Sequence, residues 1–220
     1  ALVRAGATED EARLCNVKGC YEYSIQGSMS CGMNYLNLMK PLEYTLHEGC
    51  DGVTGKFAGL KSPSVGMYRN FDELYAEYKK QLSYLMDITM EVVNSFEDYL
   101  SYINPQSMIS ATYPSCLEKA KDALAGGSVS NNTAISAGFI GDLSDSLTII
   151  KKYVYDRKEL SLSELVKILD NDFVDNENLR RKFYNDPDKY GNNRDLPDSF
   201  ATDITSFVAD YLRGKRNAKK

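Results

Sequence analysis

The sequence lacks several features that would place it in common functional classes. No apolar run approaches the roughly 20 residues that a membrane-spanning helix needs, and the first residues carry charges where a signal peptide would have its apolar centre. The net charge is −5 over 220 residues, without the basic face that nucleic-acid recognition normally shows. We therefore expect a cytoplasmic protein with no membrane and no nucleic acid among its partners.

Cysteine and histidine are too few and too scattered for a metal centre. The five cysteines form no CxxC pair, and their odd number suits neither a disulfide framework nor a zinc site. The single histidine, His47, cannot build a metal cluster or a catalytic triad unaided, and we interpret it as a cation at a helix C-terminus. No metal is expected in this chain, and a reducing compartment is its natural setting.

What is present is a chain with 43% hydrophobic residues, enough for a real core. Helical periodicity and stop signals predict helices over 7–15, 33–48, 70–103, 115–127, 142–160, 161–173 and 197–214. Residues 107–113 are interpreted as a strand end and residues 128–140 as an extended segment with an Asn–Asn turn. Residues 49–66, rich in glycine and turn formers, are expected to form a surface loop. The helix over 161–173 is expected to open with a capping box of Glu164 and Ser161, or Ser163 in place of Ser161. Helices that alternate with extended connectors predict an α/β fold.

The longest predicted helix, 70–103, carries an aromatic stripe. Asn70 is its expected cap, with Glu73 three residues on. A helical aromatic stripe is far more often core than the wall of a ligand site, so we interpret this one as core. Its members are Tyr75, Tyr78, Tyr84, Phe96 and Tyr99.

The segment "NVKGCYEYSIQG", residues 16–27, places Cys20 two residues before Glu22. In an extended backbone the two side chains point to the same side, so a thiol and a carboxylate could face one substrate. Attack by a thiolate is disfavoured, because a neighbouring carboxylate raises the pKa of a thiol. A sulfur that carries an unpaired electron and removes a hydrogen atom tolerates the carboxylate. On the motif alone, a half-buried structural cysteine in a turn is the favoured interpretation.

Five segments, in their order and spacing, resemble the second half of the pyruvate formate-lyase-like domain of glycyl radical enzymes. They are "EDEARLCNVKGCYEYSIQG", "NYLNLMKPLEYTLHEGCDGVTGK", "FDELYAEYKKQLSYLMD", "AGGSVSNNTAISAGFIGDLSDSLTIIKKYVYD" and "LSLSELVKILDNDF…NLRRKFYNDPDKYGNN". The resemblance implies a helix-rich fragment of a ten-stranded α/β barrel, roughly its second half, over residues 1–214. Residues 215–220 would be a basic tail.

In that family the cysteine of a GC-x-E turn becomes a thiyl radical and the glutamate acts as a base. By the resemblance, these two residues correspond to Cys20 and Glu22. Pyruvate formate-lyase itself has two adjacent cysteines, whereas Cys20 is followed by Tyr21, so acyl transfer is disfavoured. The Cys-x-Glu turn resembles instead the dehydratases and lyases of the family. It implies cleavage of a C–O, C–N or C–S bond in a small hydroxylated substrate.

The resemblance also implies substrate contacts near a glycine-rich strand. Ser130 and Asn132 are the candidates, and a tight turn with positive φ is an equally weighted interpretation of the preceding Gly126 and Gly127. Two alternative functions stay open. One is an arylacetate decarboxylase of the same family, and the other is a non-catalytic helical interaction module.

The family's radical is stored on a glycine in a C-terminal loop that this sequence does not contain. The resemblance therefore implies a fragment that is inactive alone and acts with the remainder of the enzyme or a glycine-loop subunit, in a parent homodimer. A separate radical S-adenosylmethionine activating enzyme, with its iron–sulfur cluster, would install the radical. The expected location is the cytoplasm, with a bacterial microcompartment as a variant of it.

Overall fold

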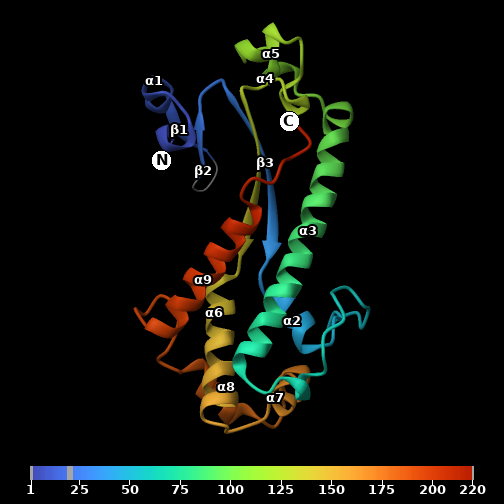
Figure 1. Ribbon diagram of the computed structural model, residues 1–220, viewed down its shortest axis with the longest axis vertical. Helices are drawn as coiled ribbons and strands as arrows, with labels where there is room; N and C mark the ends of the chain where they lie inside the picture. Colours follow the sequence, from blue (N-terminus) through green and yellow to red (C-terminus); the bar gives the residue numbers. More distant parts are fainter. Residues whose placement is uncertain (1, 19–21, 220) are drawn as a thin grey trace. The chain divides into compact units, whose positions relative to one another are not determined.

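The structure is a computed structural model that describes residues 2–18 and 22–219, with the backbone alone at Ala5, Lys18 and Glu22 (Figure 1). The strands are β1 (Cys15–Lys18), β2 (Glu22–Ile25), β3 (Met29–Asn37) and β4 (Ser130–Gly138). The α-helices are α1 (Glu9–Arg13), α2 (Met39–Leu46), α3 (Phe71–Ile103), α4 (Ser107–Ser110), α5 (Pro114–Glu118), α6 (Ile140–Ile149), α7 (Leu162–Asp170), α8 (Glu177–Tyr184) and α9 (Asp195–Leu212). The 3₁₀ turns are η1 (Val3–Ala5), η2 (Val65–Met67) and η3 (Ala123–Ala125), and η4 (Ile150–Asp156) is a π-helix.

β3 and β4 form a parallel pair joined by a helical crossover. Ser130 N donates to Ser28 O at the start of the pair (3.0 Å), and Leu38 N donates to Gly138 O at its end (3.3 Å). Both strands therefore advance in the same direction, which requires a long connection between them, and here α2 and α3 lie in that connection. This arrangement confirms the predicted α/β class.

The chain divides into two compact units. The first unit contains residues 1–34, 90–136 and 215–220, and the second contains residues 35–89 and 137–214. β3, α3 and β4 contribute residues to both units.

The prediction of one long helix is confirmed by α3, and the predicted cap at its start is confirmed too. Asn70 Oδ1 accepts a hydrogen bond from Glu73 N (2.9 Å), while the Glu73 carboxylate accepts from Arg69 N (2.8 Å). In the second unit α3 buries one apolar line completely, formed by Leu74, Tyr78, Leu82 and Met86. These residues recur at every fourth position, which is the spacing of one helix face.

The aromatic stripe of α3 is only partly core. Tyr78 is fully buried, as expected, but Phe96 and Tyr99 are 56% and 65% exposed. The interpretation as core is therefore wrong for the C-terminal part of the stripe. The periodicity shows which residues share a face of the helix, but not whether another element covers that face.

Three local predictions are wrong in instructive ways. The helix predicted over 33–48 is a strand up to Asn37, because β3 pairs with β4. Only Met39–Leu46 are helical, and Pro41 lies in the first turn of that helix, where its missing N–H costs nothing. The strand end predicted over 107–113 contains α4 instead. The Asn131–Asn132 pair lies inside β4 rather than in a turn.

The second unit is built around α6, which packs against α9 (Figure 1). Leu143 and Leu147 of α6 and Ile204 of α9 are fully buried. The predicted capping box at the start of α7 is confirmed, since Ser161 Oγ accepts from Glu164 N (3.2 Å) and the Glu164 carboxylate accepts from Ser161 N (2.7 Å). Local capping signals thus located helix starts accurately in this unit.

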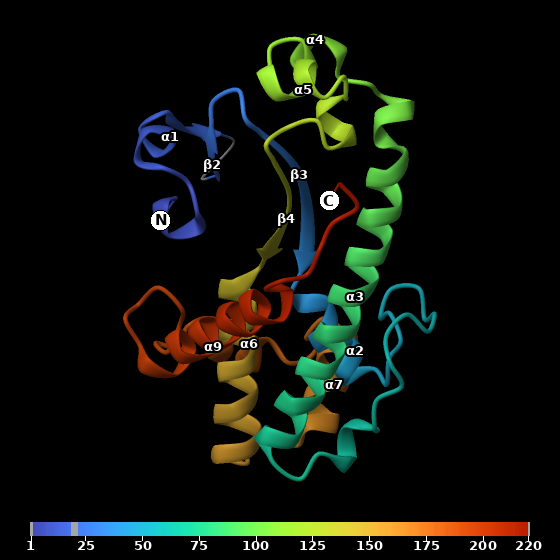
Figure 2. The ribbon, with the colours of Figure 1, turned by 45° about the horizontal axis from the view of Figure 1, so that its top comes forward.

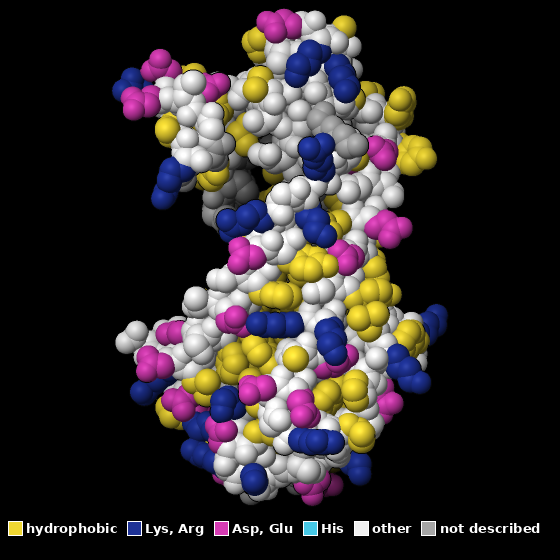
Figure 3. All heavy atoms as spheres, viewed as in Figure 1, with side chains coloured by type: hydrophobic (Ala, Val, Ile, Leu, Met, Phe, Trp, Pro, Cys, Tyr) yellow, Lys and Arg dark blue, Asp and Glu magenta, His cyan; other side chains and the backbone are white. Residues whose placement is uncertain are grey.

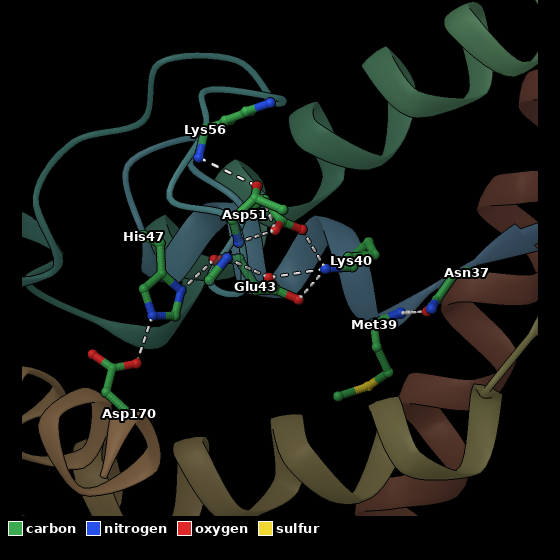
Figure 4. A network of polar contacts seen from close by, with 10 residues as sticks. Asn37, Met39, Lys40, Glu43, His47, Asp51, Lys56 and Asp170 are labelled. Atoms are coloured by element: carbon green, nitrogen blue, oxygen red, sulfur yellow. Dashed lines mark hydrogen bonds and ion pairs between the residues drawn. The ribbon is translucent and has the colours of Figure 1, made fainter. Parts of the chain in front are cut away.

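A polar network ties the loop after α2 to that helix (Figure 4). Lys40 Nζ donates to Asp51 Oδ2 (2.6 Å) and to Glu43 Oε1 (3.0 Å), and Gly52 N donates to the same Glu43 oxygen (2.7 Å). The hydrogen bonds from Lys40 to Asp51 and Glu43 raise the pKa of Lys40. The hydrogen bonds that Asp51 accepts from Lys40 and Thr54 lower the pKa of the Asp51 carboxyl group. The predicted surface loop is therefore fixed at its base.

His47 ends α2 and joins it to the end of α7 (Figure 4). Its Nδ1 donates to Glu43 O (2.9 Å) and its Nε2 lies 2.8 Å from Asp170 Oδ1. Both neighbours are acceptors, so the ring is satisfied only when both nitrogens carry protons. Burial disfavours that charged ring, but Asp170 and the Glu43 carbonyl outweigh it and raise the pKa of His47. The predicted position of His47 at a helix C-terminus is confirmed.

The His47→Gln variant is expected to lose about 1 kcal/mol of stability at acidic pH, because a partly exposed charged contact at a helix end contributes about this much. The folded-state pKa of His47 is raised, so this stabilisation is complete below the ordinary histidine pKa of about 6.5 and disappears as the pH rises through the folded-state value. Urea denaturation at pH 5.5 and pH 8.5 measures the difference. Asp170→Asn should reproduce the effect, and Asp175→Asn, an exposed neighbour, should not. An equal loss at both pH values would contradict this assignment.

The surface offers few further functional signals. Lys and Arg side chains are interspersed with Asp and Glu side chains on the face shown in Figure 3. Within the described ranges, no helix combines the length and apolarity needed to cross a membrane. In the same ranges, no group of three or more His, Cys, Asp or Glu side chains is arranged to hold a metal ion.

Candidate active site

The Cys-x-Glu segment lies at a hairpin of the first unit. β1 and β2 pair antiparallel, with Lys18 opposite Glu22 and Asn16 opposite Ser24. Ser24 Oγ also donates to Asn16 Oδ1 across the pair (2.7 Å). Cys20 belongs to residues 19–21, which lie outside the described residues, and Glu22 is the first residue of β2. In sequence, the candidate catalytic cysteine therefore lies between the two strands of this hairpin.

One face of the β3–β4 pair is covered by α3. Ser30 Oγ of β3 donates to Asn131 Oδ1 of β4 (3.2 Å), and Thr133 Oγ1 donates to the Glu97 carboxylate of α3 (2.8 Å). Gly32 lies so close to α3 that a Cβ added to it would be 2.6 Å from Glu97 Oε1. Residues 30 and 32 of β3 and residues 131 and 133 of β4 thus share the covered face.

Alternation along the strands directs their other residues to the opposite face. We call this the open face and define it by Cys31, Met33, Ser130 and Asn132. Met33 is 41% exposed, Asn132 is exposed, and Cys31 and Ser130 are half-buried. The two candidate substrate contacts, Ser130 and Asn132, therefore lie on one face and two residues apart.

The hairpin and α3 lie on opposite sides of the β3–β4 pair. Within the first unit, Figures 1 and 2 both show the two strands between the hairpin, in blue, and the C-terminal part of α3, in green. The covered face contacts α3, so the open face is the one on the side of the hairpin. Strands β1 and β2, which flank Cys20 in sequence, therefore lie on the same side of the sheet as the candidate contacts Ser130 and Asn132.

The glycine pair before β4 has a structural role. Gly126 ends η3 with a φ of 93°, a conformation that suits glycine. A Cβ added to Gly127 would lie 2.1 Å from Lys121 O. The predicted positive φ is therefore found at Gly126, whereas close approach of the backbone accounts for Gly127. The open-face position of Ser130 and Asn132 is a separate observation.

Sequence reasoning missed Cys31 and Met33 of the open face. Met33 falls in the segment predicted to be helical, and Cys31 falls in no predicted element. A segment of small and polar residues that includes Gly32 gives little periodic signal, and its strand state depends on pairing with β4, far along the chain.

Comparison with known proteins places this geometry in a family. Residues 1–220 match the family model described as pyruvate formate lyase-like. The chain is 33% identical to the trans-4-hydroxy-L-proline dehydratase of Clostridioides difficile over 215 residues, which are 97% of this chain and 27% of that protein. It is 29% identical to the (2S)-3-sulfopropanediol dehydratase of Klebsiella oxytoca, over 99% of this chain and 27% of that one.

Solved structures agree with the sequence comparison. The hydroxyproline dehydratase from Clostridioides difficile, with trans-4-hydroxy-L-proline bound, matches with a TM-score of 0.90 and 32% identity over 98% of this chain and 28% of that one. A glycyl radical enzyme from Archaeoglobus fulgidus matches with a TM-score of 0.86 and 25% identity, over 100% of this chain and 28% of that one. The chain thus spans about a quarter of the length of the curated relatives, 27% of each. Over residues 1–220, the chain belongs to the pyruvate formate lyase-like family of glycyl radical enzymes.

Proposed function

We propose that this chain is the part of a glycyl radical dehydratase or lyase that carries the hydrogen-abstracting cysteine, Cys20, and its partner base, Glu22. The observation that carries the proposal is the match to dehydratases over nearly the whole chain, with the Cys-x-Glu segment at the β1–β2 hairpin. In this proposal the chain forms roughly the second half of a ten-stranded α/β barrel, and the open face of β3 and β4 belongs to its interior.

The proposed mechanism divides the work between two side chains. The glycyl radical, held on a loop outside this sequence, supplies the unpaired electron. Cys20 gives the hydrogen atom of its S–H bond to that radical, and its Sγ then takes a hydrogen atom from the substrate carbon that bears a hydroxyl group. This step re-forms the S–H bond and leaves a carbon-centred radical. The Glu22 carboxylate takes the hydroxyl proton, so that electron density pushes out a leaving group on the neighbouring carbon. Finally, Cys20 returns its hydrogen atom to the product radical.

Ser130 and Asn132 are proposed to bind the substrate from β4. A hydroxyl group and an amide offer both donors and acceptors, and these suit a small molecule that carries several hydroxyl or charged groups. In this proposal the rest of the barrel covers the open face, and polar groups enclosed in this way discriminate strongly against substrates that leave them unpaired. No protein metal takes part in the proposal. S-adenosylmethionine and an iron–sulfur cluster belong to the separate activating enzyme that installs the radical.

The test uses the full-length gene product that contains this chain, activated anaerobically by its radical S-adenosylmethionine enzyme. Electron paramagnetic resonance quantifies the glycyl radical. The radical-bearing enzyme is then given trans-4-hydroxy-L-proline, 1,2-propanediol, glycerol, isethionate and indoleacetate in separate reactions. Loss of water or sulfite from one of the hydroxylated compounds supports the proposal.

Consumption of indoleacetate alone would replace the proposed function by decarboxylation. A radical-bearing enzyme that consumes none of the five compounds, or a gene product that never acquires the radical, would contradict it. The second of these outcomes would favour a non-catalytic helical module. The 220-residue chain alone is the matched control, and we expect no turnover from it.

A further inference from the structure

A buried ion pair lies on the covered face of the β3–β4 pair. Lys219 Nζ lies 3.0 Å from Glu97 Oε1, and the two side chains are 1% and 3% exposed. The atoms are at ion-pair distance without the alignment of a hydrogen bond. Because the loss of hydration of both charges offsets much of their attraction, such a pair is weak evidence for a stabilising role. The contacts around the ion pair with β4 indicate a role other than stabilisation.

Glu97 of the pair and Asn217, a neighbour of Lys219 in the tail, contact β4 on the two sides of Asn132. Thr133 Oγ1 lies 2.8 Å from each oxygen of the Glu97 carboxylate, to which it donates. Asn217 Nδ2 donates to Asn131 O (2.7 Å) and to Thr133 Oγ1 (3.0 Å). The residues before and after Asn132 are thus held by α3 and by the tail, 215–220, that follows α9.

Two glycines allow these segments to come together. A Cβ added to Gly32 would lie 2.6 Å from Glu97 Oε1, and one added to Gly126 would lie 2.6 Å from Lys219 O. Real Cβ atoms essentially never approach so closely, so a side chain at either position would displace the pair. β3, α3, the turn before β4 and the tail therefore converge on Glu97 and Lys219.

We propose that Glu97 and Lys219 are positioning residues for the substrate contacts on β4. Glu97 holds Thr133 directly, and Lys219 anchors the tail whose Asn217 donates to Asn131 O. Alternation then sets Asn132 and Ser130 on the open face. The effect on substrate binding rests on the proposed function. The effect on the order of β4 does not, because it follows from the contacts alone.

The experiment replaces both charges at once, in Glu97→Leu/Lys219→Met. Substitution of one partner would leave the other charge buried without compensation and could unfold the protein, whereas an apolar pair of similar size is compatible with folding. Thr133 loses its acceptor in this variant, so we expect deuterium uptake at the backbone amides of 131–134 to become about tenfold faster at an unchanged denaturation midpoint. The exposed neighbour Asp98→Asn is the matched control, with uptake unchanged.

The activated full-length enzyme provides the second readout. We expect the KM of the double variant for the compound that the wild type consumes to rise about tenfold, while the glycyl radical content is unchanged. A merely structural role would reduce the yield of folded enzyme and leave KM alone. Wild-type exchange together with a wild-type KM would overturn the proposal. If the wild type consumes none of the five compounds, the proposed function fails, and the exchange measurement decides the positioning role by itself.

Discussion

The Cys20→Ala variant of the activated full-length enzyme is expected to abolish turnover without loss of folding or of the glycyl radical. The physical reason is that alanine has no atom that can carry the unpaired electron and exchange a hydrogen atom with the substrate. The measurement combines product formation, the denaturation midpoint and the radical signal. Turnover above background in the Cys20→Ala variant, with the radical present, would refute the proposed mechanism.

The structure supplies a demanding control for this experiment in Cys31. It is a second thiol of the first unit, half-buried on the open face, and its Sγ lies 3.4 Å from Gly32 O as a weak donor. Cys31→Ala removes a sulfur from the same side of the sheet as the hairpin, so it tests whether any nearby thiol is sufficient. We expect it to keep the radical and most of the activity. If Cys31→Ala and Cys20→Ala were equally inactive, the assignment of hydrogen abstraction to Cys20 would lose its basis.

Helix starts could be predicted from this sequence because their signals are local. The caps at Asn70 and Ser161 each need only a short polar side chain and a glutamate three residues later, and both form as predicted. The start of β3 could not be predicted in the same way. Its first residues, 29–32, give little periodic signal, and residues 33–37 have helical spacing. Both parts become a strand because β4, nearly a hundred residues later, provides the partner.

The candidate site shows the same division between local and long-range information. Spacing alone makes Cys20 and Glu22 notable, but their chemistry was inferred from a family resemblance. The positions of Ser130 and Asn132 on one face follow from strand alternation once β4 is known to be a strand. Glu97 and Lys219 could not be recognised at all, because a helix residue and a tail residue become partners only through the packing of the first unit.

The Glu22→Gln variant is expected to lower turnover of the hydroxylated substrate by about 10²- to 10⁴-fold, the usual contribution of a positioned general base. Glutamine keeps the size and an acceptor oxygen but cannot take the hydroxyl proton. Cys20 is untouched, so hydrogen abstraction should continue. In D₂O the thiol gains deuterium, and the variant should return substrate labelled at the abstracted carbon while little product forms.

This pattern separates the base from the hydrogen-abstracting residue, because Cys20→Ala should give neither label nor product. Glu118→Gln, an exposed glutamate of α5 in the same unit, is the matched control and should behave as the wild type. Product formation at the wild-type rate would remove Glu22 from the mechanism. Loss of label and product together, with the radical retained, would mean that Glu22 is required for hydrogen abstraction itself, and the proposed division of roles would then be wrong.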